Sequence, residues 1–287
     1  MTGLARTEGR HPGQYNRFKS ENRLADFDDV IDNAQSDAFF KHIPSYELLI
    51  VDEAQDLSDL QWKLVNRLIS KATQVIVAGD DDQAIMVPFG ASPTAFLKLE
   101  GQTEVLTKSW RVSKSTHDYV MKHSMPLLKA RYPSRQNKDW LPTDKTGEVH
   151  TEVEKMVRPD LGDGQLREPT LQKVSLKVKD LLHRVKESEK EEWLIMAPTK
   201  KTCKLISSGL RALGIPHYLR NRPILTPDIT GSAVRVMSIH TAKGDEADNA
   251  ALVIASEADF RMITRDPRLD YVALTRAKKN IYPRVTL

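Results

Sequence analysis

Two carboxylates follow a short apolar run in the N-terminal part of the chain. The run from Tyr46 to Val51 ends directly before Asp52 and Glu53, and its length and composition predict a buried strand. In α/β proteins, the carboxyl ends of such strands hold the side chains that act on ligands. An aspartate there can hold Mg²⁺, and a glutamate can orient and deprotonate a water that attacks a phosphoryl group. The pair therefore indicates metal-assisted phosphoryl chemistry.

The same pair also has a plainer interpretation. Ser58 opens the next predicted helix, with Gln61 at capping-box spacing from it. An acidic loop that caps a helix accounts for roughly four in five Asp-Glu pairs taken without context. A second predicted strand, Gln74 to Ala78, ends at Gly79 and runs into the acidic stretch 80–82. The order strand, helix, strand is the parallel α/β pattern.

The elements that must position these residues follow from hydrophobic periodicity. An amphipathic helix is predicted from Phe27 to Phe40, and the α/β rhythm resumes after a less informative middle. We predict strands beginning at Val105 and covering Gly147 to Val153, Trp193 to Ala197, Val234 to Ile239, Ala250 to Ala255 and Ile281 to Val285. We predict helices at Thr94 to Leu99, Leu171 to Glu187, Thr202 to Leu213 and Leu269 to Lys279, and a loop at 158–170.

Composition limits the classes of protein that the chain could be. Its 287 residues are 40% hydrophobic, enough for two domains with cores of their own. The single cysteine, Cys203, excludes a disulfide framework and a cysteine-based zinc site. No apolar run approaches the roughly 18 to 20 residues that span a bilayer, and the N-terminus lacks a signal-peptide core. We expect a cytoplasmic protein without membrane contact. The net charge of +4 is weak evidence for a polyanionic partner.

A series of motifs gives the acidic clusters their context. They resemble motifs II and III of superfamily 1 DNA helicases of the UvrD/Rep type, and three further motifs follow in the order of that family. The matching segments are Val51 to Asp56 (motif II), Gly79 to Ile85 with Gly90 and Ala91 (III), Leu106 to Arg111 (IV), Ser238 to Asp248 (V) and Tyr271 to Lys278 (VI). The last is the most specific.

This resemblance implies an α/β fold with two RecA-like parallel-sheet domains, the first incomplete. The expected organisation is a poorly ordered segment over 1–24, a partial first RecA-like domain over 25–108 and a second RecA-like domain over 109–287. Only 51 residues precede Asp52, and no Gly-x-x-x-x-Gly-Lys-Ser/Thr loop (Walker A), which would hold phosphate and Mg²⁺, occurs in the chain. We therefore expect an N-terminally truncated member, compact because Arg222 to Ser232 leaves only a short connection before motif V.

The resemblance also assigns roles, with ATP and Mg²⁺ as cofactors. Asp52 would hold Mg²⁺ and Glu53 would activate water, while Gln83, Arg111 and Arg276 would contact the γ-phosphate. The guanidinium charges would stabilise phosphoryl transfer. Glu246 would accept a hydrogen bond from the ribose. The residues expected at DNA are Phe89, His240, Thr241 and Lys243.

These roles have structural alternatives. An arginine taken without its motif is usually a surface ion-pair residue, and a lone histidine such as His240 is usually structural. Motif III reads Met86-Val87-Pro88-Phe89 where the family has a stacking aromatic residue followed by arginine. Phe89 would stack one position displaced, and core packing is about as frequent a role for such a residue.

Three functions remain open. The first is an ATP-dependent helicase or translocase, 3′ to 5′ by resemblance, that moves on single-stranded DNA or at duplex junctions. The second is an inactive nucleic-acid-binding remnant, or one part of a split motor in which a second chain supplies the Walker A segment. The third is a metal-dependent nuclease that uses Asp52, Glu53, Asp80 and Asp82. It ranks last because it gives no reason for Gln83, Arg276 or motif V.

Overall fold

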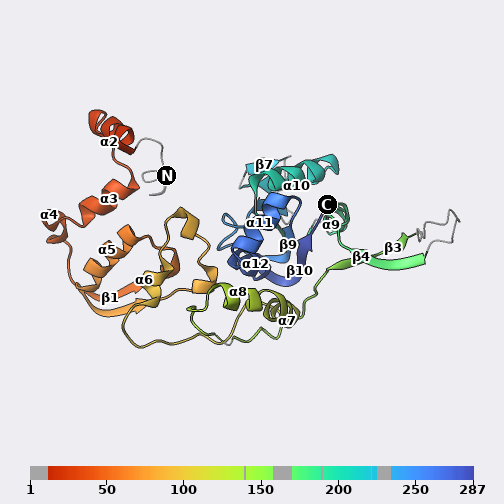
Figure 1. The fold of residues 1–287 in the computed structure, drawn as a ribbon, viewed down its shortest axis with the longest axis horizontal. Coiled ribbons are helices and arrows are strands. Elements are labelled where there is room, and N and C mark those ends of the chain that lie inside the picture. Colours follow the sequence, from red (N-terminus) through yellow and green to blue (C-terminus); the bar gives the residue numbers. More distant parts are fainter. Residues whose placement is uncertain (1–11, 139, 158–169, 189, 221, 225–233) are drawn as a thin grey trace. The chain divides into compact units, whose positions relative to one another are not determined.

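A computed structural model describes residues 12–138, 140–157, 170–188, 190–220, 222–224 and 234–287. The chain divides into two compact units (Figure 1). Unit 1 comprises 1–103 and the short segment 134–136, and unit 2 comprises 104–133 and 137–287. The expected domains, 25–108 and 109–287, follow nearly the same division but miss the return of 134–136 to unit 1.

Unit 1 contains a pair of parallel strands and the helices around it. Strands β1 (Tyr46–Val51) and β2 (Ala72–Val77) pair in parallel and are joined by helix α5 (Asp59–Ile69). The predicted capping box is present: Ser58 Oγ accepts from the Gln61 amide, and Gln61 Oε1 accepts from the Ser58 amide at 2.8 Å. The remaining helices are α2 (Pro12–Glu21), α3 (Phe27–Ala34), α4 (Asp37–Phe40) and α6 (Pro93–Leu97), with the 3-10 turns η1 (Ala54–Asp56), η2 (Asp81–Gln83) and η3 (Val87–Phe89).

The N-terminal region differs from its prediction in two places. Residues 12–21, within the segment expected to be poorly ordered, form α2; residues 1–11 lie outside the described part of the chain. The single helix predicted from Phe27 to Phe40 is two helices, because the chain leaves helical geometry at Ser36, which precedes α4 with an extended backbone. An Asp26–Asp29 capping box fixes the start of α3.

The prediction that β1 is buried is wrong in this structure. Leu48 and Ile50 are 44% and 61% exposed, and Ile76 on β2 is 53% exposed. The register pairs Ile50 with Ile76, so these side chains lie on the same face of the sheet. Within the described residues this sheet has two strands, whereas a parallel sheet is ordinarily covered on both faces. One apolar face of the sheet is therefore uncovered.

Unit 2 is built on a six-stranded sheet in the order β10-β9-β5-β8-β6-β7. The strands are β5 (Trp193–Ala197), β6 (His217–Leu219), β7 (Arg222–Ile224), β8 (Val234–Ser238), β9 (Ala247–Val253) and β10 (Ala277–Val285). All neighbours pair in parallel except the β6–β7 edge. An α/β fold with parallel sheets is thus confirmed.

Both faces of the unit 2 sheet are covered. Trp193 and Ile195 belong to one core cluster with side chains of helices α9 (Val178–Glu187) and α10 (Lys200–Ala212). The alternate residues Leu194 and Met196 are also fully buried. The other helices are α7 (Lys114–His123), α8 (Met125–Arg131), α11 (Glu257–Arg265) and α12 (Arg268–Leu274), and α12 contacts β9 and β10. The carboxyl ends of the central parallel strands are therefore set on a rigid core.

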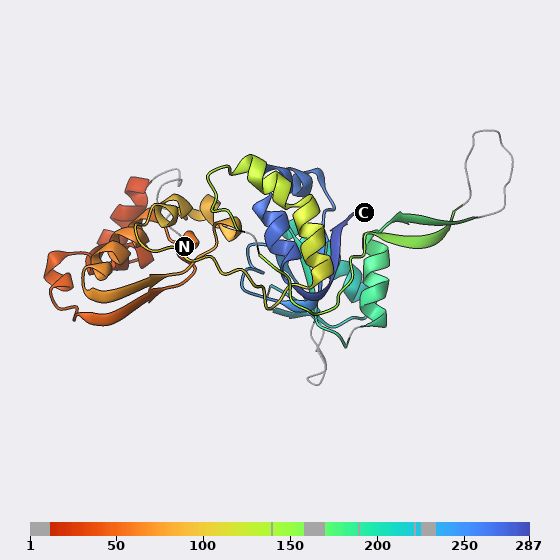
Figure 2. The ribbon, with the colours of Figure 1, turned by 90° about the horizontal axis from the view of Figure 1, so that it is seen from below.

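Four predictions in unit 2 are wrong. No strand forms over 147–151, where Val149 makes only an isolated bridge to Ile281, and the next strand begins at Glu152. The loop predicted over 158–170 lies outside the described residues except for Thr170. The segment 171–175, predicted as the start of a helix, belongs to strand β4 (Thr170–Ser175), which pairs antiparallel with β3 (Glu152–Val157). This hairpin extends away from the body of unit 2 (Figure 2). The predicted helix Leu269 to Lys279 ends at Leu274, and β10 begins at Ala277. No strand begins at Val105 in the described structure, where only an isolated bridge joins Lys108 to Leu141. None of the described helices is long and apolar enough to cross a membrane.

Candidate functional site

The carboxylate pair lies where the sequence predicts it, at the end of β1. Asp52 and Glu53 are both exposed, and Asp52 Oδ1 accepts from the Glu53 amide at 2.8 Å. Glu53 has the left-handed backbone angles φ 51° and ψ 36°, which a non-glycine residue rarely adopts and which are characteristic of strained functional turns. This turn directs the chain from the strand into η1, so both carboxylates remain accessible to a ligand.

Gln55 connects the ends of the two strands. Its side chain is fully buried; Nε2 donates to Glu53 Oε2 at 2.5 Å, and Oε1 accepts from the Asp80 amide at 2.8 Å. A Cβ on Gly79 would lie 2.6 Å from Gln55 Oε1, so any other residue at this position would force the hydrogen-bonded amide to shift. The sequence motif includes Gln55, but sequence reasoning assigned it no role. It positions Glu53 relative to the loop after β2.

The acidic stretch after β2 holds Gln83 in place. Asp80 Oδ1 accepts from the Asp82 amide, and Asp80 Oδ2 accepts from Gln83 Nε2 at 2.7 Å. The Asp82 carboxylate forms a buried ion pair with Arg135, and Asp81 accepts from the Gln136 amide at 3.0 Å. Glu53, Gln55, Asp80 and Gln83 are thus joined by consecutive hydrogen bonds in unit 1. The motifs in the sequence include all of these residues except Arg135 and Gln136, which lie outside every motif.

This arrangement does not suit the nuclease alternative. It would need Asp52, Glu53, Asp80 and Asp82 around shared metal ions. Instead, Asp80 binds Gln83 and Asp82 binds Arg135. Among the described residues, no group of three His, Cys, Asp or Glu side chains is arranged to hold a metal ion. The acidic residues after β2 organise a loop.

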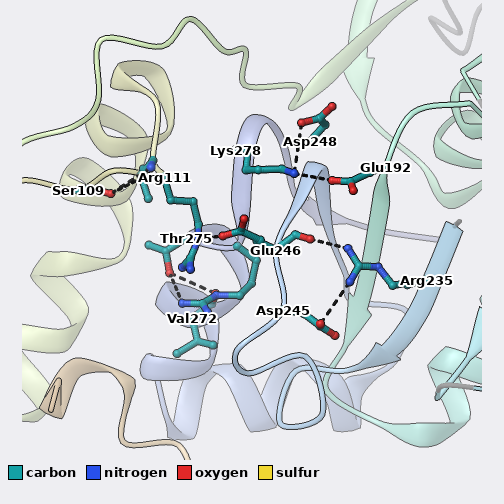
Figure 3. A network of polar contacts seen from close by, with 12 residues as sticks. Ser109, Arg111, Glu192, Arg235, Asp245, Glu246, Asp248, Val272, Thr275 and Lys278 are labelled. Carbon is teal, nitrogen blue, oxygen red and sulfur yellow. Dashed lines mark hydrogen bonds and ion pairs between the residues drawn. The ribbon is translucent and has the colours of Figure 1, made fainter. Parts of the chain in front are cut away.

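In unit 2, Arg111 and Glu246 form an ion pair with 2.6 Å between Arg111 Nε and Glu246 Oε2 (Figure 3). The two residues are 135 positions apart in the sequence, and the fold brings them into contact. Arg111 lowers the pKa of Glu246 through this hydrogen bond, although the pair is partly exposed. Ser109 Oγ accepts from the amides of Arg111 and Val112 and fixes the turn that presents the guanidinium. Motifs IV and V, predicted from separate segments, therefore meet within unit 2.

Neighbouring charges hold the loop that carries Glu246. Arg235 on β8 donates to Asp245 Oδ1 at 3.2 Å and to the Glu246 carbonyl oxygen at 2.5 Å. Lys278 on β10 donates to Glu192 at 2.5 Å, and that hydrogen bond raises the lysine pKa. These contacts appear together in Figure 3. Sequence reasoning assigned no role to Arg235 or Lys278, because neither contact is local in the sequence.

A pocket of about 430 Å³ surrounds the ion pair. It is lined by Ser109, Trp110, Arg111, Lys145, Glu246 and Lys278. Three cationic side chains thus face one carboxylate, and the exposed indole of Trp110 adds an aromatic surface. The volume falls in the usual range for small-molecule sites. This donor set fits a ligand that combines phosphates with hydroxyl groups and a ring, as a nucleotide does.

The side chain of Arg276 is buried and does not extend into solvent. It is only 3% exposed, and its Nε donates to the Val272 carbonyl oxygen at 3.1 Å, one turn back along α12. Its carbonyl oxygen accepts from the Ala247 amide, which ties motif VI to the start of β9. The γ-phosphate role of Arg276 stays a prediction.

The residues predicted at DNA lie at the surface of their units. His240, Thr241 and Lys243 follow β8 in a turn where Ser238 Oγ and Thr241 Oγ1 are 2.8 Å apart. His240 and Lys243 are half-buried and Thr241 is exposed. Phe89 on η3 is 45% exposed. DNA contact by these four residues stays a prediction.

Comparison with known proteins finds a superfamily 1 helicase model in each half of the chain, and the model in the first half is of the UvrD/Rep type. A family model described as "UvrD/REP helicase N-terminal domain" matches residues 7–104, and one described as "Viral superfamily 1 RNA helicase core domain" matches residues 165–284. "ATP-dependent DNA helicase PcrA" of Leuconostoc citreum is 31% identical over 132 residues, which cover 43% of this chain and 15% of PcrA. "ATP-dependent DNA helicase Rep" of Buchnera aphidicola subsp. Baizongia pistaciae is 35% identical over 94 residues, covering 30% of this chain and 14% of Rep.

These alignments span about 15% of the length of the relatives, so they concern the motor motifs and not the whole proteins. A solved structure titled "The structure of PRRSV helicase" covers 82% of the chain and 34% of that chain at 18% identity with a TM-score of 0.39, a value too low to support an argument about the fold. The family model of the N-terminal part and these relatives support a likeness of the chain to superfamily 1 helicases of the UvrD/Rep type.

Proposed function

We propose that the chain is part of an ATP-dependent DNA helicase or translocase that couples ATP hydrolysis to 3′-to-5′ movement on single-stranded DNA. The pocket around Arg111 and Glu246 is the observation that carries this proposal. It offers guanidinium and ammonium groups to phosphates and a carboxylate to a ribose hydroxyl, in a volume that accommodates a nucleotide. The relatives named as ATP-dependent DNA helicases support the same substrate.

The residues of unit 1 suit the hydrolytic part of the reaction. Glu53 would orient and deprotonate the attacking water, and its carboxylate accepts a hydrogen bond from Gln55. Asp52, exposed beside it, would hold Mg²⁺, which when bound neutralises phosphate charge. Gln83, oriented by Asp80, would contact the γ-phosphate. Arg111 and Arg276 would supply positive charge as phosphoryl transfer proceeds.

A binding titration tests the nucleotide site directly. A fluorescent ATP analogue is titrated into the intact chain and into Arg111→Ala. Loss of a charge-assisted hydrogen bond is expected to weaken binding about tenfold. The control is Arg261→Ala, which removes an exposed arginine from the Glu257 ion pair on α11 and should leave affinity unchanged. Equal affinities for the intact chain and Arg111→Ala would place the nucleotide elsewhere.

The uncovered face of the unit 1 sheet favours a second, related proposal. We infer that the chain is one part of a two-chain motor, whose partner contributes a parallel strand and the phosphate-binding loop. A parallel pair with Ile50 and Ile76 exposed is expected to gain stability when further apolar structure covers it. Robust ATP hydrolysis by this chain alone would overturn this proposal.

The Ile50→Lys substitution tests the same surface. With a polypeptide supplying the loop present, Ile50→Lys should abolish the gain in hydrolysis, because it places a charge on the face to be covered. The control Phe260→Lys changes an exposed apolar residue of unit 2 and should retain the gain. Retention of the gain in Ile50→Lys would show that this face is not the docking surface.

A further inference from the structure

Three residues of the chain belong to a different unit from the residues on either side. The chain passes from unit 1 into unit 2 at Glu104, returns to unit 1 for Ser134 to Gln136, and re-enters unit 2 at Asn137. A connection between two compact units ordinarily runs over the surface with few contacts. The return segment 134–136 instead forms hydrogen bonds with Asp81 and Asp82 in the loop that follows β2.

The attachment is a buried ion pair with matched geometry. Arg135 Nε donates to Asp82 Oδ1 at 2.6 Å, and Nη2 donates to Asp82 Oδ2 at 2.5 Å. The two side chains are 5% and 3% exposed, and the hydrogen bond to Asp82 raises the arginine pKa. Next to it, the Gln136 amide donates to Asp81. A planar guanidinium and a carboxylate in this fork arrangement fix orientation as well as distance.

Hydrogen bonds to Asp80 connect the backbone of Asp82 to the side chain of Gln83. The turn η2 is only three residues long, and its first cap, Asp80, accepts from the Asp82 amide and from the Gln83 side chain. The backbone of Asp82 is therefore held by the carboxylate that orients Gln83. A shift of Asp82 would disturb the hydrogen bonds that Asp80 accepts. Three successive contacts therefore connect the Arg135 guanidinium to the Gln83 side-chain amide, through Asp82 and Asp80.

We propose that Arg135 is a positioning residue that sets the orientation of Gln83 through Asp82 and Asp80, and that couples this loop to the two connections leading into unit 2. The significance of Gln83 in this proposal rests on the proposed function; the mechanical connection does not. The coupling predicts that loosening the return segment loosens the loop around Gln83, even though the two are more than 50 residues apart in sequence.

Hydrogen–deuterium exchange of the intact chain, without ATP or DNA, tests the connection. In Arg135→Gln, peptides covering 79–86 and 134–138 should both exchange about tenfold faster, because the buried Asp82 loses its partner. Peptides of β5 and α10 should be unchanged. The matched control Arg268→Gln breaks a mostly buried arginine–aspartate pair in unit 2 and should leave 79–86 unchanged. Faster exchange in 134–138 alone would overturn the proposal.

Two further variants cover the case in which Arg135→Gln unfolds unit 1. Arg135→Lys retains the charge but loses the fork, and it should accelerate exchange in the same two peptides by a smaller factor. The exchanged pair Arg135→Asp with Asp82→Arg should restore part of the protection. If Arg135→Lys leaves exchange in 79–86 unchanged, the proposal fails.

The exchange result and the nucleotide result are separate. Absence of ATP binding would contradict the proposed function while leaving the exchange coupling intact. Conversely, if the chain is active with its loop supplied, Arg135→Gln should lower kcat about tenfold with little change in the KM for ATP, because only a positioning interaction is lost. An unchanged kcat in that preparation would show that Arg135 does not position Gln83 for the reaction.

Discussion

The Arg111–Glu246 pair sets up a competition that can be measured. In the structure, Glu246 holds Arg111 at 2.6 Å, so an incoming phosphate must displace or share that contact. The substitution Glu246→Gln keeps the shape and removes the charge. The pocket then changes from three cations and one carboxylate to three cations alone. Binding of inorganic tripolyphosphate should therefore strengthen.

The magnitude follows from the exposure of the pair. The two side chains are 34% and 45% exposed, and ion pairs of this kind contribute about 1 kcal/mol or less. Removing the competing carboxylate should thus raise tripolyphosphate affinity by up to about fivefold. The increase should shrink as ionic strength rises, because screening weakens contacts between exposed charges. ATP should gain less than tripolyphosphate, because the ribose hydroxyl loses a charged acceptor.

Isothermal titration calorimetry gives both affinities for the intact chain and for the variant. The control is Glu257→Gln, which removes the same charge from α11, where the carboxylate pairs with Arg261, away from the pocket residues. The pKa of Glu246 lies below its ordinary value, so the competition should persist at neutral pH and disappear only as the pH falls through that lowered pKa. Equal gains for Glu246→Gln and its control, or weaker tripolyphosphate binding by Glu246→Gln, would refute this reasoning.

Three further predictions concern local structure. Glu53→Gly should have a free energy of unfolding about 0.5 to 1 kcal/mol higher than Glu53→Ala, because both variants lose the hydrogen bond from Gln55 and only glycine relieves the left-handed backbone; urea unfolding of the two variants checks this, and equal stabilities would contradict it. Gly79→Ala should lower it by about 1 to 3 kcal/mol, since the new Cβ meets Gln55 at 2.6 Å; unchanged urea unfolding would argue against that close approach. Burial raises the pKa of Cys203 to about 11, so the native thiol should resist a disulfide reagent at about pH 8 and react after unfolding; rapid reaction of the folded chain would be inconsistent with this burial.

Local sequence signals were sufficient to predict elements whose bounds depend only on the residues within them. The bounds of β1 and the Ser58 capping box follow from an apolar run and from a pair of residues at fixed spacing. The start of β10 at Ala277 and the strand at Thr170 did not follow, because each is set by pairing with another strand, β9 and β3 respectively. Helical periodicity in these segments was overridden by sheet formation.

The sequence predicted which residues take part in the site better than it predicted how those residues are arranged. Motif order identified Glu53, Gln83, Arg111 and Glu246, and the fold brings the last two together within unit 2. Sequence reasoning could not identify Arg135, because its partner lies across a long separation and its own neighbourhood resembles an ordinary charged connection. The uncovered face of β1 was also missed, since burial depends on what packs against a strand and not on the strand itself.

The most direct test of the central claim is DNA-stimulated ATP hydrolysis. Each assay uses single-stranded DNA and Mg²⁺, with the intact chain beside Glu53→Gln, alone and with a polypeptide that supplies the phosphate-binding loop. We predict little or no turnover by the chain alone, and DNA-dependent turnover with the loop supplied that Glu53→Gln abolishes. Turnover that Glu53→Gln leaves intact, or metal-dependent cutting of DNA without ATP, would contradict the assignment of this chain as part of an ATP-driven motor.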